Sequence, residues 1–296
     1  MGKLLSIGIL TVGLFGGAFA QIKKQFTVEN PEQCKDIRLS LKAKTGNCYI
    51  RPSQSSDILN IYSNQDLDEY AHSFKNEIRN GTCLVKLALE HESQKGVGKM
   101  ITYQVFGGEE KIDDKLWKVY LTDSKPYVLD LEYGLGLASV DLSGLAISRL
   151  KINTGSADVN VAYSSGLENK VTMDTFAVKV DVGSLNVRQM HLAKSKLVLA
   201  DVGFGNMFLD FSERPLVNNH IVGSVGAGNL VIMLPDSEVP VMVKINESWL
   251  CSVNLSKSLH KIGANTFVNA AYERDSKNAL TFDLDVSLGK IVFKEK

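Results

Sequence analysis

The chain has 296 residues, and its 33 lysines and arginines balance its 33 aspartates and glutamates. This balance argues against electrostatic capture of nucleic acid and gives no reason to expect attraction to an anionic membrane surface. The length is sufficient for one large hydrophobic core or for two small ones.

The first twenty residues have the composition of a secretory signal peptide. Lys3 forms a short basic region, an apolar stretch runs from Leu4 to Phe15, and Ala18-Phe19-Ala20 matches an A-x-A cleavage site. Glycines in this stretch lower its helix propensity, which favours a cleaved signal over an anchoring transmembrane helix. No later segment approaches the roughly 20 apolar residues of a bilayer span. We therefore expect an exported protein, in the periplasm or on the cell surface, with no integral membrane span after residues 1–20 are removed.

Residues 21–127 form a β-rich region with a less regular pattern than the rest of the chain. Strand-like runs lie at Cys83–Leu89 and Lys99–Phe106, whereas Asp66–Ile78 has apolar residues at helical spacing. Cys34 and Cys48 flank one predicted strand–turn unit, which favours a disulfide between them in an oxidising compartment. Cys48 could equally be a small buried hydrophobic residue, and that interpretation is the favoured one for Cys251.

A seven-residue pattern recurs along the chain, each time after a short apolar run: small, any, small, polar, apolar, any, apolar. The four intervals between its central copies are 19, 28, 20 and 23 residues, which is the length of one coil of a β-solenoid. Alternating runs such as Val178–Val182 lead into the pattern and indicate strands. The copies begin at Lys44, Gly136, Gly155, Gly183, Gly203, Gly226 and Ser287.

The pattern predicts an all-β fold in which residues 128–296 form a solenoid of stacked short-strand coils. Val239–Asn246 reads as a further strand, and residues 247–279 are irregular. An antiparallel sandwich with glycine-rich hairpins is the alternative fold. In the solenoid, glycines at the corners are expected to adopt positive φ, and the polar residues after them are expected to stack as a structural ladder. The corner glycines and ladder residues are Gly155, Asp158, Gly183, Asn186, Gly203, Asn206, Gly226 and Asn229.

Several segments resemble the bacterial toast-rack envelope proteins. They are Trp117–Leu121, Leu129–Gly136, Leu150–Val161 and Val225–Pro235, followed by the closing strand Gly289–Phe293. These proteins are similar to adhesin-like β-solenoids and to the C-terminal region of cell-wall-active antibiotic response proteins. The resemblance covers roughly residues 115–293 and implies a solenoid fold, with little implication for activity. Residues 21–114 have no counterpart in it.

The sequence contains no convincing catalytic, metal or cofactor site. Its five histidines form no H-x-x-x-H or H-E-x-x-H pair, and a strand at Glu90-His91-Glu92 would point the imidazole away from both carboxylates. A glycosidase pair needs carboxylates that converge, yet the candidate acids occupy ordinary outward strand positions. These acids are Asp158, Asp181, Asp201 and Asp210.

We therefore expect a non-enzymatic envelope protein that presents a solenoid surface to another envelope protein or to a cell-surface polymer. The less regular segments, Asp66–Tyr127 and 247–279, are the expected partner sites. A polysaccharide-active enzyme on a β-helix is the alternative, and an accessory of an envelope-stress signalling system is a third interpretation that rests on the resemblance alone.

Overall fold

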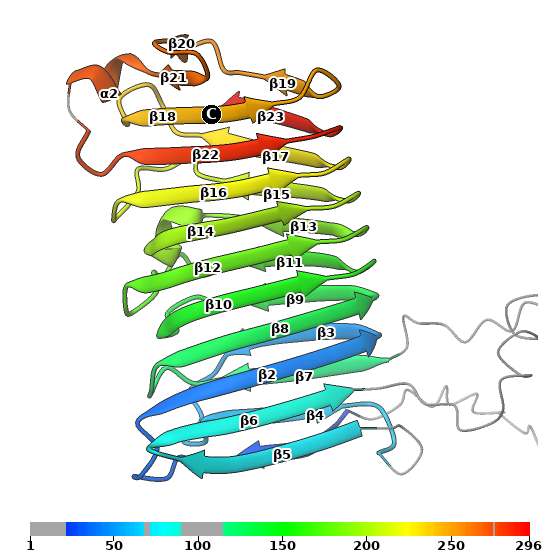
Figure 1. Ribbon diagram of the computed structural model, residues 1–296. Coiled ribbons are helices and arrows are strands. Elements are labelled where there is room, and N and C mark those ends of the chain that lie inside the picture. The colour runs from blue at the N-terminus through cyan, green and yellow to red at the C-terminus, as the bar shows by residue number, and fades with distance from the viewer. Residues whose placement is uncertain (1–21, 68–71, 90–114, 275) are drawn as a thin grey trace, which may run out of the picture.

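The computed structural model describes residues 22–67, 72–89, 115–274 and 276–296, which form a β-solenoid. Two long sheets, sheet A of 11 strands and sheet B of 12, face each other along the stack of coils (Figure 1). The predicted all-β solenoid is confirmed. The predicted signal peptide and the strand predicted at Lys99–Phe106 lie outside the described residues, as does Glu90-His91-Glu92.

Each regular coil has a longer strand in sheet B, a tight corner and a shorter strand in sheet A. Strand alternation sends every second side chain inward, so that Val159 and Val161 are buried while Asp158 and Asn160 face solvent. Because the strands pair in parallel and in register, inward apolar residues of successive coils lie next to one another. Leu150, for example, lies between Leu129 and Phe176. One apolar core therefore runs the length of the stack.

Sheet A contains the short strands. In spatial order they are β1 (Lys23–Val28), β4 (Leu59–Ser63), β7 (Leu116–Leu121), β3 (Asn47–Pro52), β9 (Leu137–Asp141), β11 (Asp158–Ala162), β13 (Ser184–Val187), β15 (Asn206–Asp210), β17 (Asn229–Leu234), β23 (Lys290–Glu295) and β19 (Ser252–Asn254).

Sheet B contains the remaining strands, and two short helical segments, η2 (Met190–Ala193) and α2 (Ala270–Arg274), lie in connections. The strands in spatial order are β20 (His260–Lys261), β21 (Thr266–Val268), β18 (Val241–Glu247), β22 (Leu280–Val286), β16 (Asn219–Val225), β14 (Ser195–Val202), β12 (Met173–Val180), β10 (Ile147–Thr154), β8 (Tyr127–Leu135), β2 (Asp36–Thr45), β6 (Thr82–Leu89) and β5 (His72–Arg79).

The coils do not stack in chain order at either end. The β2–β3 coil lies between β8–β9 on one side and β6 with β7 on the other, and the last coil, β22–β23, inserts between β16–β17 and β18–β19. Strands of the predicted regions 21–127 and 128–296 thus share both sheets. Antiparallel strands close the ends of the stack, with β1, β4 and β5 at one end and β20 with β21 at the other.

One secondary-structure prediction is wrong. The helical spacing of Asp66–Ile78 does not give a helix over its second half, because His72–Arg79 forms strand β5 and pairs antiparallel with β6. The turn between the two strands is Asn80-Gly81, with φ of 51° and 81°. Two successive left-handed residues suit a tight hairpin, and that local turn outweighs a weak helical pattern. The strands predicted at Cys83–Leu89 and Val239–Asn246 are confirmed as β6 and β18.

Gly136 adopts the predicted positive φ, at 118°, but the four other predicted corner glycines are needed for a different reason. None of Gly155, Gly183, Gly203 and Gly226 adopts a left-handed φ. Instead, successive coils approach so closely that a Cβ on Gly183 would lie 2.1 Å from the carbonyl oxygen of Ala157. The same close approach recurs, at 2.3 Å, at four further corners; these are Gly136, Gly205, Gly228 and Gly289.

The polar ladder also differs by one residue from the prediction. Asp158, Asn206 and Asn229 share one register position, but Ser184 occupies it in the intervening coil, and Asn186 lies two residues further on, opposite Asn160. The Ser184 hydroxyl donates to Asp158 over 2.5 Å, and Asn229 donates to Asn206 over 2.8 Å. The prediction failed because it aligned Gly183 with the first small residue of the pattern, whereas Gly183 stacks on Ala157, the second.

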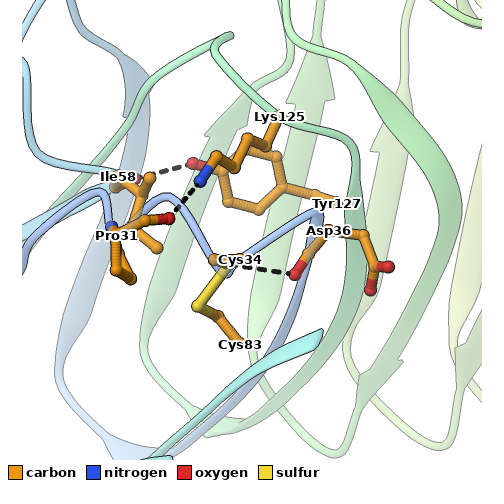
Figure 2. Close-up of a disulfide and its surroundings, with 7 residues drawn as sticks. All are labelled: Pro31, Cys34, Asp36, Ile58, Cys83, Lys125 and Tyr127. Atoms are coloured by element: carbon orange, nitrogen blue, oxygen red, sulfur yellow. Dashed lines mark hydrogen bonds between the residues drawn. A yellow bond between two sulfur atoms is a disulfide. The ribbon is translucent and has the colours of Figure 1, made fainter. Parts of the chain in front are cut away.

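The expected Cys34–Cys48 disulfide is wrong, because Cys34 pairs with Cys83 (Figure 2). Parallel pairing of β2 with β6 brings Cys34, two residues before β2, close to Cys83, the second residue of β6, with 5.6 Å between the two Cα atoms. Cys48 points into the core on β3 and is a buried free thiol, and Cys251 is a half-buried one. Beside the disulfide, Tyr127 donates its hydroxyl to the Ile58 carbonyl over 2.6 Å, which ties β8 to the segment before β4 (Figure 2).

Candidate binding face

The outer surface of sheet A near its N-terminal end carries tyrosines and cationic side chains in alternation. On one row, strand pairing places Lys24 beside Tyr62, Tyr62 beside Lys118, and Lys118 beside Tyr49. The Cβ atoms of directly opposed residues on neighbouring strands lie about 5 Å apart, so each lysine on this row has a tyrosine beside it. We call this surface, with the second row below, the tyrosine–lysine face.

A second row lies two residues along the same strands. It places Tyr120 between Asn60 and Arg51. The rings of Tyr120 and Tyr62 meet edge to face, with centroids 5.6 Å apart and planes at 89°. Such an arrangement fixes both rings with their polar ends at the surface.

Arg51 is held flat on this face by three hydrogen bonds. Its guanidinium donates to the carbonyl oxygens of Ile50 (3.0 Å) and Ser139 (3.2 Å) and to the Ser139 hydroxyl (3.0 Å). Its central carbon lies 5.6 Å from the centroid of the Tyr49 ring. The charge is therefore positioned before any ligand arrives, and a ligand loses little entropy in ordering it.

Two adjoining depressions hollow the tyrosine–lysine face. The larger has a volume of about 490 Å³, and the smaller about 390 Å³. Lys118 and Tyr120 line both, so they form the rise between the two hollows. Ser53, Ser55 and Asn60 add hydroxyl and amide groups to the floor of the larger one.

The face carries more positive than negative charge. Asp57 lies 3.7 Å from Lys24 and offsets it. Among the described residues, neither Arg51 nor Lys118 takes part in a salt bridge. On a chain whose charges balance overall, this is a locally cationic surface.

Half-buried tyrosine rings beside cationic side chains suit a ligand that is flat, polar and anionic. The ring of a sugar packs its C–H face on an aromatic side chain while its hydroxyls bond to the surrounding serine and asparagine groups. Guanidinium and ammonium groups bind carboxylate, sulfate or phosphate substituents. The face therefore has the chemistry for an acidic glycan that lies along the rows.

The acids considered for glycoside hydrolysis do not converge. Asp158 lies on sheet A and accepts from Ser184, whereas Asp201 lies on sheet B, where it accepts from Ser224 over 2.8 Å. Asp210 accepts from the backbone N–H of Ser212 over 3.0 Å. Among the described residues, no three histidine, cysteine, aspartate or glutamate side chains lie together as a metal site would require.

Burial keeps two titratable groups of the core, the Cys48 thiol and the Tyr133 phenol, in their neutral forms. Burial raises the pKa of Cys48 to about 12, although the neighbouring Tyr133 hydroxyl partly offsets the rise. Burial likewise raises the pKa of the Tyr133 phenol well above its usual value. This thiol–phenol pair is closed off from solvent and supplies no nucleophile.

The sequence did hold a signal for the tyrosine–lysine face. Tyr49-x-Arg51 and Lys118-x-Tyr120 each place a ring and a cation on one side of a strand. Neither pair could be joined to the other from sequence, because the pairing of β3 with β7 is not between consecutive strands. The face lies partly within the predicted partner segment Asp66–Tyr127 and mostly before it. The other predicted partner segment, 247–279, forms the opposite end of the stack.

Two solved structures are similar to the chain along most of its length. The putative cell adhesion protein of Clostridium sporogenes is 17% identical over 93% of this chain and 100% of its own, with a TM-score of 0.43. The putative lipid binding protein of Parabacteroides distasonis is 11% identical over 93% of this chain and 94% of its own, with a TM-score of 0.32. No curated protein matches the chain.

Within the described part of the chain, every helix is too short or too polar to cross a bilayer. Residues 18–188 match the family described as the N-terminal domain of toast_rack, DUF2154. This match confirms the toast-rack resemblance and extends it into residues 21–114, for which the sequence suggested no counterpart. The chain belongs to the toast-rack N-terminal domain family.

Proposed function

We propose that the protein is an exported, non-enzymatic envelope protein that binds an acidic polysaccharide on its tyrosine–lysine face. The observation that carries the proposal is the row of alternating rings and cations, Lys24, Tyr62, Lys118 and Tyr49. Its elements repeat across strands about 4.8 Å apart, so several successive sugar residues could be contacted along it.

The flat shape of the solenoid supports binding over catalysis. The two depressions are open and lie side by side on one surface, and among the described residues that line them there is no aspartate or glutamate. Asp57, which contacts two residues that line the larger depression, lies 3.7 Å from Lys24 and accepts from the Ser55 hydroxyl over 3.4 Å. A glycosidase would need two carboxyl groups facing each other across the sugar.

The proposal is tested by calorimetric titration of the purified protein with polygalacturonate, with neutral dextran as the comparison polymer. Lys118→Gln should weaken polygalacturonate binding about tenfold or more, and Tyr62→Ala should do the same without changing net charge. Lys196→Gln is the matched control, since Lys196 is an exposed lysine on sheet B, far from the face.

If Lys118→Gln and Lys196→Gln weakened polygalacturonate binding equally, binding would depend only on the net charge of the protein. That result would overturn the assignment of this face. Binding of dextran as tight as that of polygalacturonate would overturn the acidic ligand class. Release of reducing sugar from polygalacturonate would favour the enzymatic alternative. Cross-linking of the face to one envelope protein, with no polymer bound, would assign it to a protein partner instead.

A further inference from the structure

A line of exposed apolar side chains follows the edge of the solenoid where sheet B turns into sheet A. Each regular corner has one outward residue between two small or polar residues. In four of these corners, and at Trp249 in the longer corner after β18, that residue is large and apolar. We call this line the corner ridge. It consists of Leu135 (43% exposed), Val182 (60%), Phe204 (77%), Leu288 (59%) and Trp249 (90%).

The ridge is continuous because the coils stack in register. From the N-terminal end, the outward corner residues are Thr45, Leu135, Ser156, Val182, Phe204, Ala227, Leu288 and Trp249. Coils are about 4.8 Å apart, so the line is about 34 Å long. The corners that carry it lie at the edge of the solenoid where the arrowheads of sheet B end (Figure 1).

The fold does not require these apolar side chains. Ser156 and Ala227 occupy the same corner position as Phe204, with the same backbone hydrogen bond to the preceding coil. A serine or an alanine is thus sufficient for the corner. Five large apolar groups aligned on one edge, one of them a nearly fully exposed tryptophan, form a patch of the kind that marks an interaction site.

When two copies of the ridge lie antiparallel, most side chains of one copy oppose side chains of similar size on the other. A two-fold axis between Val182 and Phe204, perpendicular to the stack, places Val182 opposite the partner's Phe204 and Leu135 opposite the partner's Leu288. The same axis sets the two small residues, Ser156 and Ala227, against each other and leaves the largest, Trp249, over the smaller Thr45. Large groups therefore oppose large groups at the centre of the contact and again at Leu135 and Leu288, with the small pair of Ser156 and Ala227 between them.

The same two-fold axis brings mostly compatible charged and polar residues together beside the ridge. On the sheet B side, Lys179 would face Asp201 of the second copy in addition to Asp201 of its own chain, which lies 3.8 Å away, and both are exposed. On the sheet A side, Ser184 would face Asn206, and Asp158 would face Asn229. One like-charged match arises, between Glu132 and Asp285. Each of these carboxylates already has a partner in its own chain, Lys42 at 2.7 Å and the Asn246 amide at 2.8 Å.

We propose that the corner ridge joins two copies of this chain as an antiparallel two-fold dimer, with Val182 and Phe204 at its centre. A two-fold contact uses the same surface on both copies and closes on itself, so it buries the ridge without leaving a second one exposed. The proposal is independent of the polysaccharide face, since the two surfaces share no residue.

Sedimentation equilibrium of the purified protein tests the proposal, and twice the chain mass is expected. Phe204→Glu places two carboxylates at the centre of the dimer and should weaken association at least about hundredfold. The matched control is Leu167→Glu, because Leu167 is 60% exposed on the opposite edge. A circular dichroism spectrum shows that both variants are folded. A monomer at every concentration, or a dimer that Phe204→Glu leaves intact, would overturn the proposal.

Disulfide trapping tests the register. In a Cys251→Ser background, a Leu135→Cys protein mixed with a Leu288→Cys protein should form a cross-linked heterodimer on oxidation, whereas Leu135→Cys alone should not. Cross-linking of Leu135→Cys to itself would overturn the axis. A monomeric protein that co-sediments with phosphatidylcholine vesicles, with loss of binding in Phe204→Glu, would instead assign the ridge to lipid.

Discussion

Replacing Gly205 with alanine should destabilise the solenoid by about 2–3 kcal/mol, although it adds a single methyl group. The new Cβ would lie 2.3 Å from the carbonyl oxygen of Gly183 and 2.5 Å from a methyl carbon of Val180. Ordinary contacts of a Cβ begin at 3.4 Å, so the two coils must separate by about 1 Å at this corner. The same oxygen accepts the N–H of Asn206 over 3.0 Å, and that hydrogen bond would lengthen as the coils part.

The matched control is Gly263→Ala, where a Cβ would meet Thr266 at an ordinary 3.6 Å. Its effect should be within about 0.5 kcal/mol of zero or slightly stabilising, because alanine restricts the unfolded chain. Urea unfolding followed by circular dichroism measures both variants, with the midpoint expected to fall only for Gly205→Ala. Equal midpoints would refute the argument that corner glycines are required by the contact between coils.

Four further outcomes are expected. Cys83→Ser should lower stability by about 4 kcal/mol, the chain-entropy value for a disulfide that closes a 49-residue separation; a thermal melt with and without reductant measures it. In the folded protein, a thiol reagent should label Cys251 but not Cys48, and mass spectrometry should find both labelled after denaturation in urea. Asn169→Ala should cost about 3 kcal/mol by urea unfolding, because the buried amide bonds to backbone groups of three segments at 2.7–3.3 Å. Burial would raise the pKa of Asp141, but hydrogen bonds from two serines outweigh it and hold the pKa below its usual value. Its contribution to stability is therefore present above about pH 4 and lost as the pH falls below that, and Asp141→Asn should flatten this part of the stability curve.

The repeat predicted the solenoid because stacking imposes the same requirements on every coil. A corner needs small residues, and the strands beside it need inward apolar residues such as Val159 and Val161. These requirements recur at fixed positions and so are visible in a single sequence. Gly183 marks where the pattern becomes ambiguous. Two glycine positions exist per corner, and the pattern alone could not tell which of them Gly183 occupies, so the ladder was shifted to Asn186 in that coil.

Connections between distant segments could not be predicted. The pairing of Cys34 with Cys83 depends on β6 stacking beside β2, and the sequence places β3, β4 and β5 between them. The same limit applies to the last coil, since β22 enters between β16 and β18. Local patterns specify what a strand buries but not which other strand it pairs with when the coils depart from chain order.

The two proposed surfaces lie at positions that the fold leaves unconstrained. The row position of Tyr49 is occupied in the following coils by Ser139, Asn160 and Asn186, and the corner position of Phe204 by Ser156 and Ala227. A sequence repeat records what successive coils share, and these positions are the ones at which they differ. Large aromatic or apolar residues at such positions add little to the core, and their exposure costs solubility. Their presence in continuous lines is therefore better explained by what binds to them than by the stability of the coil that carries them.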